Sequence, residues 1–183
     1  RDEQVVMAKE VLKAFSMSTN LVVEAGTGVG KSMAYLLPSA LGALRSGSRI
    51  GVATKTNALL DQIVYKELPL LKSTLADAGV GDLSYVALKG FSHYPCMRKV
   101  SHIVSDGART VNVTGKDVSQ APSIAALLSY IEQTEYDDMD GLKLDYRVLP
   151  RYAITTTSRE CLKRKCPFFG PQCFVHGLRK RAE

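Results

Sequence analysis

Apolar residues recur every three or four positions in several parts of the chain, which is the spacing of one face of an α-helix. This period is found in residues 4–15, 33–44, 59–71 and 124–133. Three shorter apolar segments lack the period and stand next to polar or glycine-containing turns: residues 21–23, 49–54 and 83–88. These patterns predict four helices and three buried strands.

The predicted elements alternate between helix and strand over the first 90 residues. Alternation of this kind indicates an α/β fold, in which a parallel sheet is covered by helices. After Gly90 the alternation stops, and the stretch to about Cys173 holds all four cysteines, one clear helix candidate and many polar turns. We interpret this stretch as an inserted, mainly helical second unit.

Composition narrows the class of protein. The chain has 183 residues, of which 45% are apolar and 23% charged, and these proportions are typical of a globular protein. No apolar run is long enough to cross a bilayer, so we expect no membrane span. The chain begins with Arg1, and its first residues carry charges throughout, so they lack the apolar centre of a secretory signal. We therefore expect a cytoplasmic piece of a longer protein.

Charge is unevenly distributed along the chain. Lys and Arg outnumber Asp and Glu by 24 to 18, and the resulting net charge of +6 hints at a polyanionic partner. Most of that charge lies in residues 159–183, which contain seven basic and two acidic residues. Residues 132–145 reverse the sign, with six acidic residues and one basic residue. We interpret this acidic stretch as a solvated insertion.

A glycine-rich segment links the first predicted strand to the next predicted helix. It fits the P-loop pattern except that alanine replaces the first glycine, and its residues are Ala25, Gly26, Thr27, Gly28, Val29, Gly30, Lys31 and Ser32. Glycines let backbone N–H groups turn towards phosphate oxygens, and the helix N-terminus adds a positive dipole end. Lys31 is placed to reach the β- and γ-phosphates of ATP or another nucleotide, and the Ser32 hydroxyl is placed to coordinate Mg²⁺. The alternative is a glycine-rich turn with an exposed lysine.

The four cysteines are Cys96, Cys161, Cys166 and Cys173, and the last three are close enough in sequence to converge on one metal centre. A P-loop enzyme works in a reducing compartment, where thiols stay free of disulfides. Three interpretations remain: buried structural thiols, a zinc site with four cysteines, or an iron-sulfur cluster held by four thiolates. The Cys166-Pro167 pair is similar to the Cys-Pro of ferredoxin cluster loops, which mildly favours iron.

The glycine-rich segment resembles the first motif of superfamily-two helicases. Arg1 and Gln4 stand at the positions of that group's Q motif, and the resemblance implies that Gln4 contacts the adenine edge. Residues 54–62 resemble the motif that follows in those enzymes, and it implies that Thr54, Lys55 and Thr56 contact the backbone of single-stranded DNA. The alternative for residues 54–62 is an ordinary strand-to-helix junction capped by Thr56.

Residues 88–96, Leu-Lys-Gly-Phe-Ser-His-Tyr-Pro-Cys, resemble a segment of the DinG/XPD-like iron-sulfur DNA helicases in which the cysteine is the first cluster ligand. The three later cysteines match the remaining ligands of the DinG branch in order and approximate spacing. The pattern departs at Phe91 and His93, where the family usually has Arg and Asn. The resemblance implies a 4Fe-4S cluster on all four cysteines and contacts to DNA phosphates from Lys163, Arg164 and Lys165; the alternative for these basic residues is a solvated loop.

The same resemblance implies an organisation and an activity. Residues 1–90 correspond to the N-terminal part of a RecA-like motor domain, residues 91–175 to an inserted iron-sulfur domain, and residues 176–183 to the return towards the motor domain. ATP hydrolysis in the full protein, with Lys31 and Ser32 as catalytic groups, is coupled to movement on single-stranded or forked DNA. No Walker B carboxylate pair follows an apolar strand, so we expect no unwinding by this chain alone. We expect a monomer.

Two other functions stay open on the sequence. One is a zinc-stabilised nucleic-acid-binding module with a nucleotide site that does not hydrolyse ATP. The other is a P-loop metabolic kinase with a metal-stabilised lid, which the motif at residues 54–62 disfavours.

Overall fold

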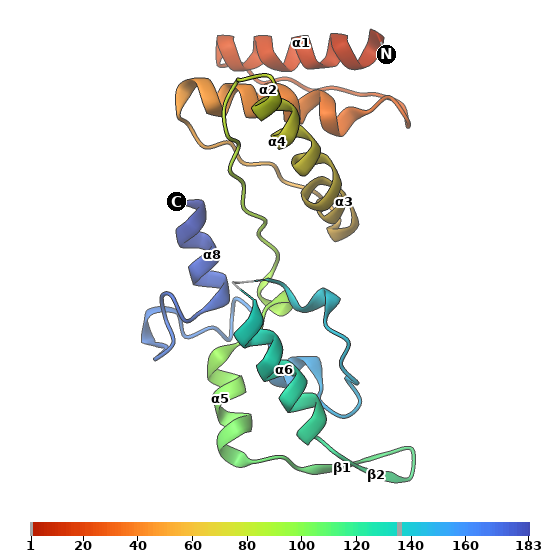
Figure 1. The fold of residues 1–183 in the computed structure, drawn as a ribbon, viewed down its shortest axis with the longest axis vertical. Coiled ribbons are helices and arrows are strands. Elements are labelled where there is room, and N and C mark those ends of the chain that lie inside the picture. Colours follow the sequence, from red (N-terminus) through yellow and green to blue (C-terminus); the bar gives the residue numbers. More distant parts are fainter. Residues whose placement is uncertain (1, 135–136) are drawn as a thin grey trace. The chain divides into compact units, whose positions relative to one another are not determined.

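The computed structural model describes residues 2–134 and 137–183, and the chain separates into two compact units, one up to Tyr85 and one from Val86 onward (Figure 1). None of the helices in these residues combines the length and the apolar character that a membrane-spanning helix requires. Most of the ordered backbone is helical, and the strands form one small antiparallel sheet. The fold is therefore mixed α/β, with helices predominating.

The first unit is built from helices alone. Its elements are α1 (Asp2–Met17), α2 (Lys31–Ser46), α3 (Asn57–Gln62), the π-helical turn η1 (Ile63–Glu67) and α4 (Leu68–Asp77). The apolar positions of α2 and of the later helices meet in one core, whose buried residues are Leu36, Ala40, Ile63, Leu71, Leu75 and Leu83. The helices predicted from the apolar period in residues 4–15, 33–44 and 59–71 are confirmed, each with somewhat different ends.

The segment α3–η1–α4 runs without a break and contains a local widening. The Leu68 N–H donates to the carbonyl of Ile63, five residues earlier, so η1 is a π-helical turn. Pro69 follows directly, and a proline has no N–H to donate and crowds the preceding turn. The widened turn lets the helix continue past this proline, which brings Leu71 and Leu75 of α4 into the core.

The three predicted strands of the first 90 residues are not formed in the described structure. Residues 21–23, 49–54 and 83–88 have no regular secondary structure, so the predicted parallel sheet is absent from the described residues. A strand is stable only when a neighbouring strand pairs with its backbone N–H and C=O groups, and none of these segments has such a neighbour here. Most of their side chains are accordingly exposed, and Val22 keeps 96% of its surface accessible, whereas Leu83 is buried in the core of the first unit.

The second unit combines short helices with a hairpin. Its elements are η2 (Phe91–His93), α5 (Met97–Asp106), β1 (Thr110–Val113), β2 (Lys116–Ser119), α6 (Ala121–Gln133), η3 (Met139–Gly141), α7 (Arg151–Ile154), η4 (Lys163–Lys165) and α8 (Phe174–Ala182). The helix predicted at residues 124–133 is confirmed as α6. One apolar core joins α5, α6 and the segments after them, with Val100, Ile124, Leu127, Met139, Leu149 and Ile154 buried. A second core consists of Tyr94, Phe174, Val175 and Leu178.

Strands β1 and β2 form a hairpin that sequence analysis did not predict (Figure 1). Val113 pairs with Lys116, so the loop has two residues, Thr114 and Gly115. Both adopt positive φ angles, 49° and 81°, as a type I′ turn requires. The Gly115 N–H also donates to the side-chain oxygen of Asn112 at 3.0 Å, which holds the turn closed.

Part of the acidic stretch is not solvated, which corrects the interpretation from sequence. The side chain of Lys89 is only 3% exposed, and its Nζ lies 3.1 Å from Asp138 Oδ2 and 2.9 Å from Asp140 Oδ2. Asp140 also accepts from His93 Nδ1 at 2.8 Å and from Arg151 at 2.6 Å. Because a buried ammonium group needs a partner, the two aspartates fasten the segment before Cys96 to η3 and α7.

Asp140→Asn is expected to destabilise the second unit by about 1–2 kcal/mol at pH 7, since charge-assisted hydrogen bonds are lost from a partly exposed carboxylate. Partial burial raises the pKa of Asp140, but hydrogen bonds from Lys89, His93 and Arg151 outweigh this and hold it well below the usual value. A carboxyl group with a lowered pKa stabilises the fold above its unfolded pKa, about 3.9. The difference between the two proteins should therefore shrink as the pH falls below about 4.

Urea unfolding monitored by tyrosine fluorescence at pH 7 and pH 3 measures this difference. Asp106→Asn is the matched control, because Asp106 pairs with Arg109 at 2.9 Å while both side chains are more than half exposed. We expect the control to change stability by a few tenths of a kcal/mol. Equal effects of the two substitutions at pH 7 would show that the Asp140 network does not stabilise the unit.

Candidate functional site

The glycine-rich segment forms the loop that leads into α2. Gly28 and Gly30 have φ angles of 79° and 83°, in the left-handed region that favours glycine. Gly30 is the N-cap of α2, and Lys31 and Ser32 are the first two residues of that helix. Ala25 and Val29 are half-buried, whereas Gly26 and Thr27 are exposed. The loop therefore places its lysine and serine at the positive end of a 16-residue helix.

Lys31 is held by its own loop. Its Nζ donates to the carbonyl oxygen of Ala25 at 2.7 Å and to that of Gly26 at 2.8 Å. These carbonyls curve the loop around the ammonium group without neutralising its charge. The arrangement keeps a cation beside the backbone of the loop, where an anionic ligand would be attracted.

Gln4 contacts the same loop from α1. Its Nε2 donates to the carbonyl of Gly30 at 3.1 Å, and a Cβ added at Gly30 would lie 2.5 Å from that nitrogen. The positive φ therefore favours glycine at position 30, and a larger residue would also displace the end of the Gln4 side chain. The implied contact of Gln4 with adenine stays a prediction. Arg1, its companion in the proposed motif, lies outside the described residues.

Residues 54–56 form the turn before α3. The Thr56 hydroxyl accepts from the Leu59 N–H at 3.3 Å, so Thr56 caps the helix, as the alternative from sequence anticipated. The Thr54 hydroxyl donates to the Thr56 carbonyl at 3.1 Å, and Lys55 is exposed. The cap and a contact with DNA are compatible, because the Lys55 side chain takes no part in the cap.

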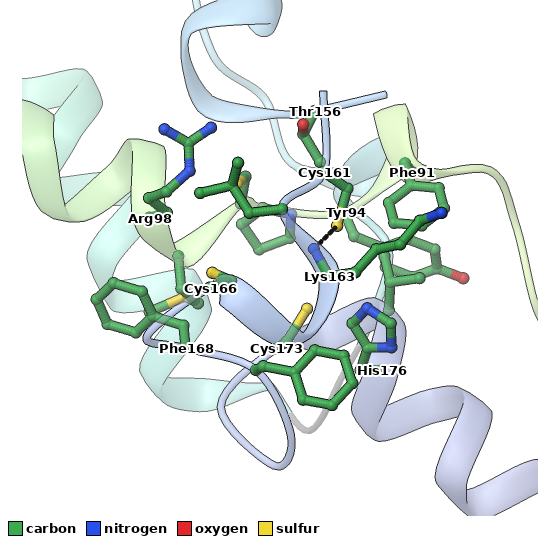
Figure 2. Close-up of a pocket in the computed structure, with 16 residues that line it drawn as sticks. Phe91, Tyr94, Arg98, Thr156, Cys161, Lys163, Cys166, Phe168, Cys173 and His176 are labelled. Carbon is green, nitrogen blue, oxygen red and sulfur yellow. Dashed lines mark hydrogen bonds between the residues drawn. The ribbon is translucent and has the colours of Figure 1, made fainter. Parts of the chain in front are cut away.

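All four cysteines line one cavity of about 30 Å³ in the second unit (Figure 2). Cys96 precedes α5, and its N–H donates to the carbonyl of Ile154 at 2.7 Å. Cys161 and Cys166 stand on either side of η4, and Cys173 is the N-cap of α8. The fold thus brings Cys96 to the three cysteines from which it is separated in sequence.

Apolar side chains make up much of the cavity wall. They include Tyr94, Met97, Leu162, Phe168, Phe169 and Val175. Tyr94 is buried, and its hydroxyl accepts from the Lys89 N–H at 2.9 Å. A wall of this kind would shield a bound group from water. Phe174 is instead buried in the core with Tyr94 and Leu178.

The surroundings of Cys173 favour its thiol form in the absence of a cation. Burial raises the pKa of Cys173, an effect that backbone N–H groups of His176 and Val175 partly offset and the nearby Cys161 and Cys96 reinforce. A bound cationic centre reverses this balance, because thiols deprotonate when they coordinate a metal. In the described residues, no group of three or more Cys, His, Asp or Glu side chains is arranged to hold a metal ion as it stands. The residues that fit a metal centre are the four cysteines, whose free thiols surround one shielded cavity.

The basic residues between the cysteines lie on an exposed turn beside this cavity. Lys163, Arg164 and Lys165 make up η4, and all three are exposed. Lys163 has a φ of 50°, and its N–H donates to Cys161 Sγ at 3.4 Å. The backbone of this turn therefore donates a hydrogen bond to a cysteine of the cavity, while the three basic side chains remain exposed to solvent.

Sequence analysis gave no role to His176, which also lines the cavity. The available signal was its position three residues after Cys173, because residues three apart in a helix lie on the same face. The ion pairs of Lys89 with Asp138 and Asp140 were also missed. They join residues far apart in sequence, and no short sequence motif predicts such a network.

Comparisons with known proteins identify the relatives of this chain. It is 34% identical to the ATP-dependent helicase DinG of Mycobacterium tuberculosis (strain ATCC 25618 / H37Rv) over 196 aligned residues, which cover all of this chain and 28% of that protein. The ATP-dependent DNA helicase YoaA of Haemophilus influenzae is 32% identical over 185 residues, covering all of this chain and 26% of that protein. The chain is related to the DinG-type helicases. The resemblance stated from sequence is thereby confirmed.

A further DinG-type relative aligns over a shorter stretch. The ATP-dependent DNA helicase DinG of Escherichia coli K12 is 28% identical over 161 residues, covering 82% of this chain and 22% of that protein. This chain thus spans roughly a quarter of the length of the curated relatives it matches. No family model matches the chain. No solved structure matches it either.

Proposed function

We propose that this chain is the nucleotide-binding and cluster-holding part, towards the N-terminus, of an ATP-dependent DNA helicase. The observation that carries the proposal is the phosphate loop. Two left-handed glycines curve it, and Lys31 stands at the first position of α2 with its ammonium group turned onto the loop. Backbone, helix dipole and cation then act together on the phosphates of ATP.

In the nucleotide complex, Lys31 exchanges its contacts with the carbonyls of Ala25 and Gly26 for the β- and γ-phosphates. The adjacent Ser32 hydroxyl would hold Mg²⁺, which would supply positive charge to offset that of the phosphates. Gln4 contacts the adenine edge from α1, and its hydrogen bond to Gly30 sets the distance between that helix and the loop. Together these groups orient the triphosphate for attack by water in the complete enzyme.

The four cysteines hold a 4Fe-4S cluster. Their convergence on one cavity with an aromatic and aliphatic wall supports this, because thiolate-bound iron is protected by exclusion of water. When bound, the cluster supplies a rigid cross-link between distant segments and a one-electron redox centre. Cys96, Cys161, Cys166 and Cys173 are its proposed ligands.

Single-stranded or forked DNA is the proposed polyanionic partner. Thr54, Lys55 and Thr56 contact its backbone at the turn before α3. Lys163, Arg164 and Lys165 contact phosphates beside the cluster, and their exposure on η4 supports this. Each phosphate neutralised by a basic side chain releases counterions, so binding should weaken steeply as salt rises.

In the complete protein, the apolar segments at residues 21–23, 49–54 and 83–88 pair with further strands in a parallel sheet. The exposure of Val22, Val52 and Tyr85 supports this, because burying such side chains stabilises a fold. Residues 1–90 then belong to the motor domain and residues 91–175 to the cluster domain. Residues 176–183 begin the return of the chain to the motor domain. The free thiols are consistent with a reducing, cytoplasmic location.

The test uses the full-length protein and this chain side by side. The full-length protein should hydrolyse ATP faster when single-stranded DNA is present and should separate the strands of a forked duplex. This chain alone should bind Mg²⁺–ATP with negligible turnover. A full-length protein that binds zinc, contains no iron and does not hydrolyse ATP would instead be a zinc-stabilised binding module.

A further inference from the structure

His176 occupies the first turn of α8 and shares the cavity with the four cysteines (Figure 2). Its backbone N–H already contacts Cys173, and its ring stacks at a tilt on Phe169, with 4.3 Å between the ring centroids. His176 is therefore held at the cavity by its backbone contact with Cys173 and by the contact of its ring with Phe169.

The Nε2 atom of His176 is buried and has no hydrogen-bond partner in the part of the chain that the structure describes. A buried polar atom without a partner is unfavourable, so such atoms in folded proteins are rare and call for an explanation. The other two histidines differ, because His93 bonds to Asp140 and His102 is exposed on α5. Among the described histidines, only His176 lines the cavity and has a buried ring nitrogen without a hydrogen-bond partner.

The protonation state limits what this atom can bind. A histidine ring carries one N–H when neutral and two when protonated, so Nε2 is a donor unless the single proton of the neutral ring is on Nδ1. Thiolates and inorganic sulfide only accept hydrogen bonds. A sulfur acceptor in the cavity therefore selects the tautomer that has its proton on Nε2.

We propose that the Nε2–H of His176 donates a hydrogen bond to a sulfur atom of the cluster or of its cysteine ligands, and thereby raises the reduction potential of the cluster. The inference rests on the proposed cluster. Its physical reason is that reduction adds negative charge to the cluster, and a hydrogen bond to sulfur stabilises the more negative state more strongly. The backbone N–H groups that donate to Cys161 and Cys173 also raise the reduction potential, and His176 adds a side-chain donor.

The test is a redox titration of the anaerobically purified chain, followed by electron paramagnetic resonance of the reduced cluster. His176→Phe keeps an aromatic ring against Phe169 but removes the donor. We expect about a tenfold lower ratio of reduced to oxidised cluster at the wild-type midpoint potential, a shift of about 59 mV for one electron. His176→Gln, whose amide nitrogen reaches the place of Nε2, should recover most of the shift, and the exposed-site control His102→Phe should show none.

An unchanged midpoint potential in His176→Phe with wild-type iron content overturns the inference and leaves the cluster itself in place. Absence of iron from the wild-type protein overturns the cluster proposal as well, and the iron assay separates the two failures. If His176→Phe does not retain a cluster, wild-type protein labelled with [15N]histidine provides the answer. A weak nitrogen coupling in pulsed resonance of the reduced cluster supports the hydrogen bond, whereas no coupling, or one as large as that of a directly bound histidine, overturns it.

Discussion

Cys166→Ser is expected to reduce the iron content of anaerobically purified protein from about four atoms per chain to nearly none. Each thiolate holds one corner of the proposed cluster, and the alcohol of serine is a much weaker ligand for iron because it stays protonated near neutral pH. The remaining three cysteines stand directly before α5, beside η4 and directly before α8, so none of them can also fill the position of Cys166. Iron and sulfide analysis, with the visible absorption spectrum, measures the loss.

Leu162→Ala is the matched control for this substitution. Leu162 lines the same cavity but has no ligand atom, so the variant should keep most of its iron while its cluster becomes more accessible to oxygen. Retention of full iron by Cys166→Ser would contradict the proposed ligand set. One zinc and no iron in the wild-type chain would leave the phosphate loop intact and favour the zinc-stabilised module.

Lys31→Ala is expected to weaken binding of Mg²⁺–ATP by roughly 100-fold, about 2.7 kcal/mol. The loop holds this side-chain cation through the carbonyls of Ala25 and Gly26. Its removal leaves the phosphates with the backbone donors of the loop and Mg²⁺, but without a side-chain cation from the loop. Because Lys31 is not part of the apolar core, the variant should fold like the wild type. Titration with a fluorescent ATP analogue in the presence of Mg²⁺ measures the affinity.

Lys55→Ala serves as the control for charge. Lys55 is exposed in the turn before α3, so its removal should leave the affinity for ATP unchanged while weakening binding to a single-stranded oligonucleotide. The slope of the logarithm of DNA affinity against the logarithm of salt concentration should fall by about 0.7 for one lost contact to a single strand. Equal ATP affinities of the Lys31→Ala variant and the wild type would exclude the proposed phosphate site.

The helices could be predicted from sequence because their apolar period is local. Residues 33–44 predicted most of α2, and residues 124–133 predicted most of α6. The expected strands failed for a non-local reason, since a strand at residues 21–23 requires a neighbour that the period cannot supply. The β1–β2 hairpin was missed because each strand has four residues and only a Thr-Gly pair marks its turn.

The candidate sites were predicted through short motifs whose residues are close in sequence. The glycine-rich loop is such a motif, and so is the run of three cysteines from Cys161 to Cys173. What joins distant segments was not visible in the sequence: Lys89 with Asp138 and Asp140. These contacts depend on how the second unit folds, and no residue spacing encodes them.

The backbone hydrogen bond from Cys96 to Ile154 has a consequence for biosynthesis. During translation, Cys96 leaves the ribosome long before Cys161, and its place at the cavity is fixed only after α7 has been made and has folded back onto the start of α5. The set of four thiols is complete only when Cys173 has emerged. Iron for the proposed cluster would therefore be delivered only after the chain has been made as far as Cys173, and until then the thiol of Cys96 would have to be kept reduced.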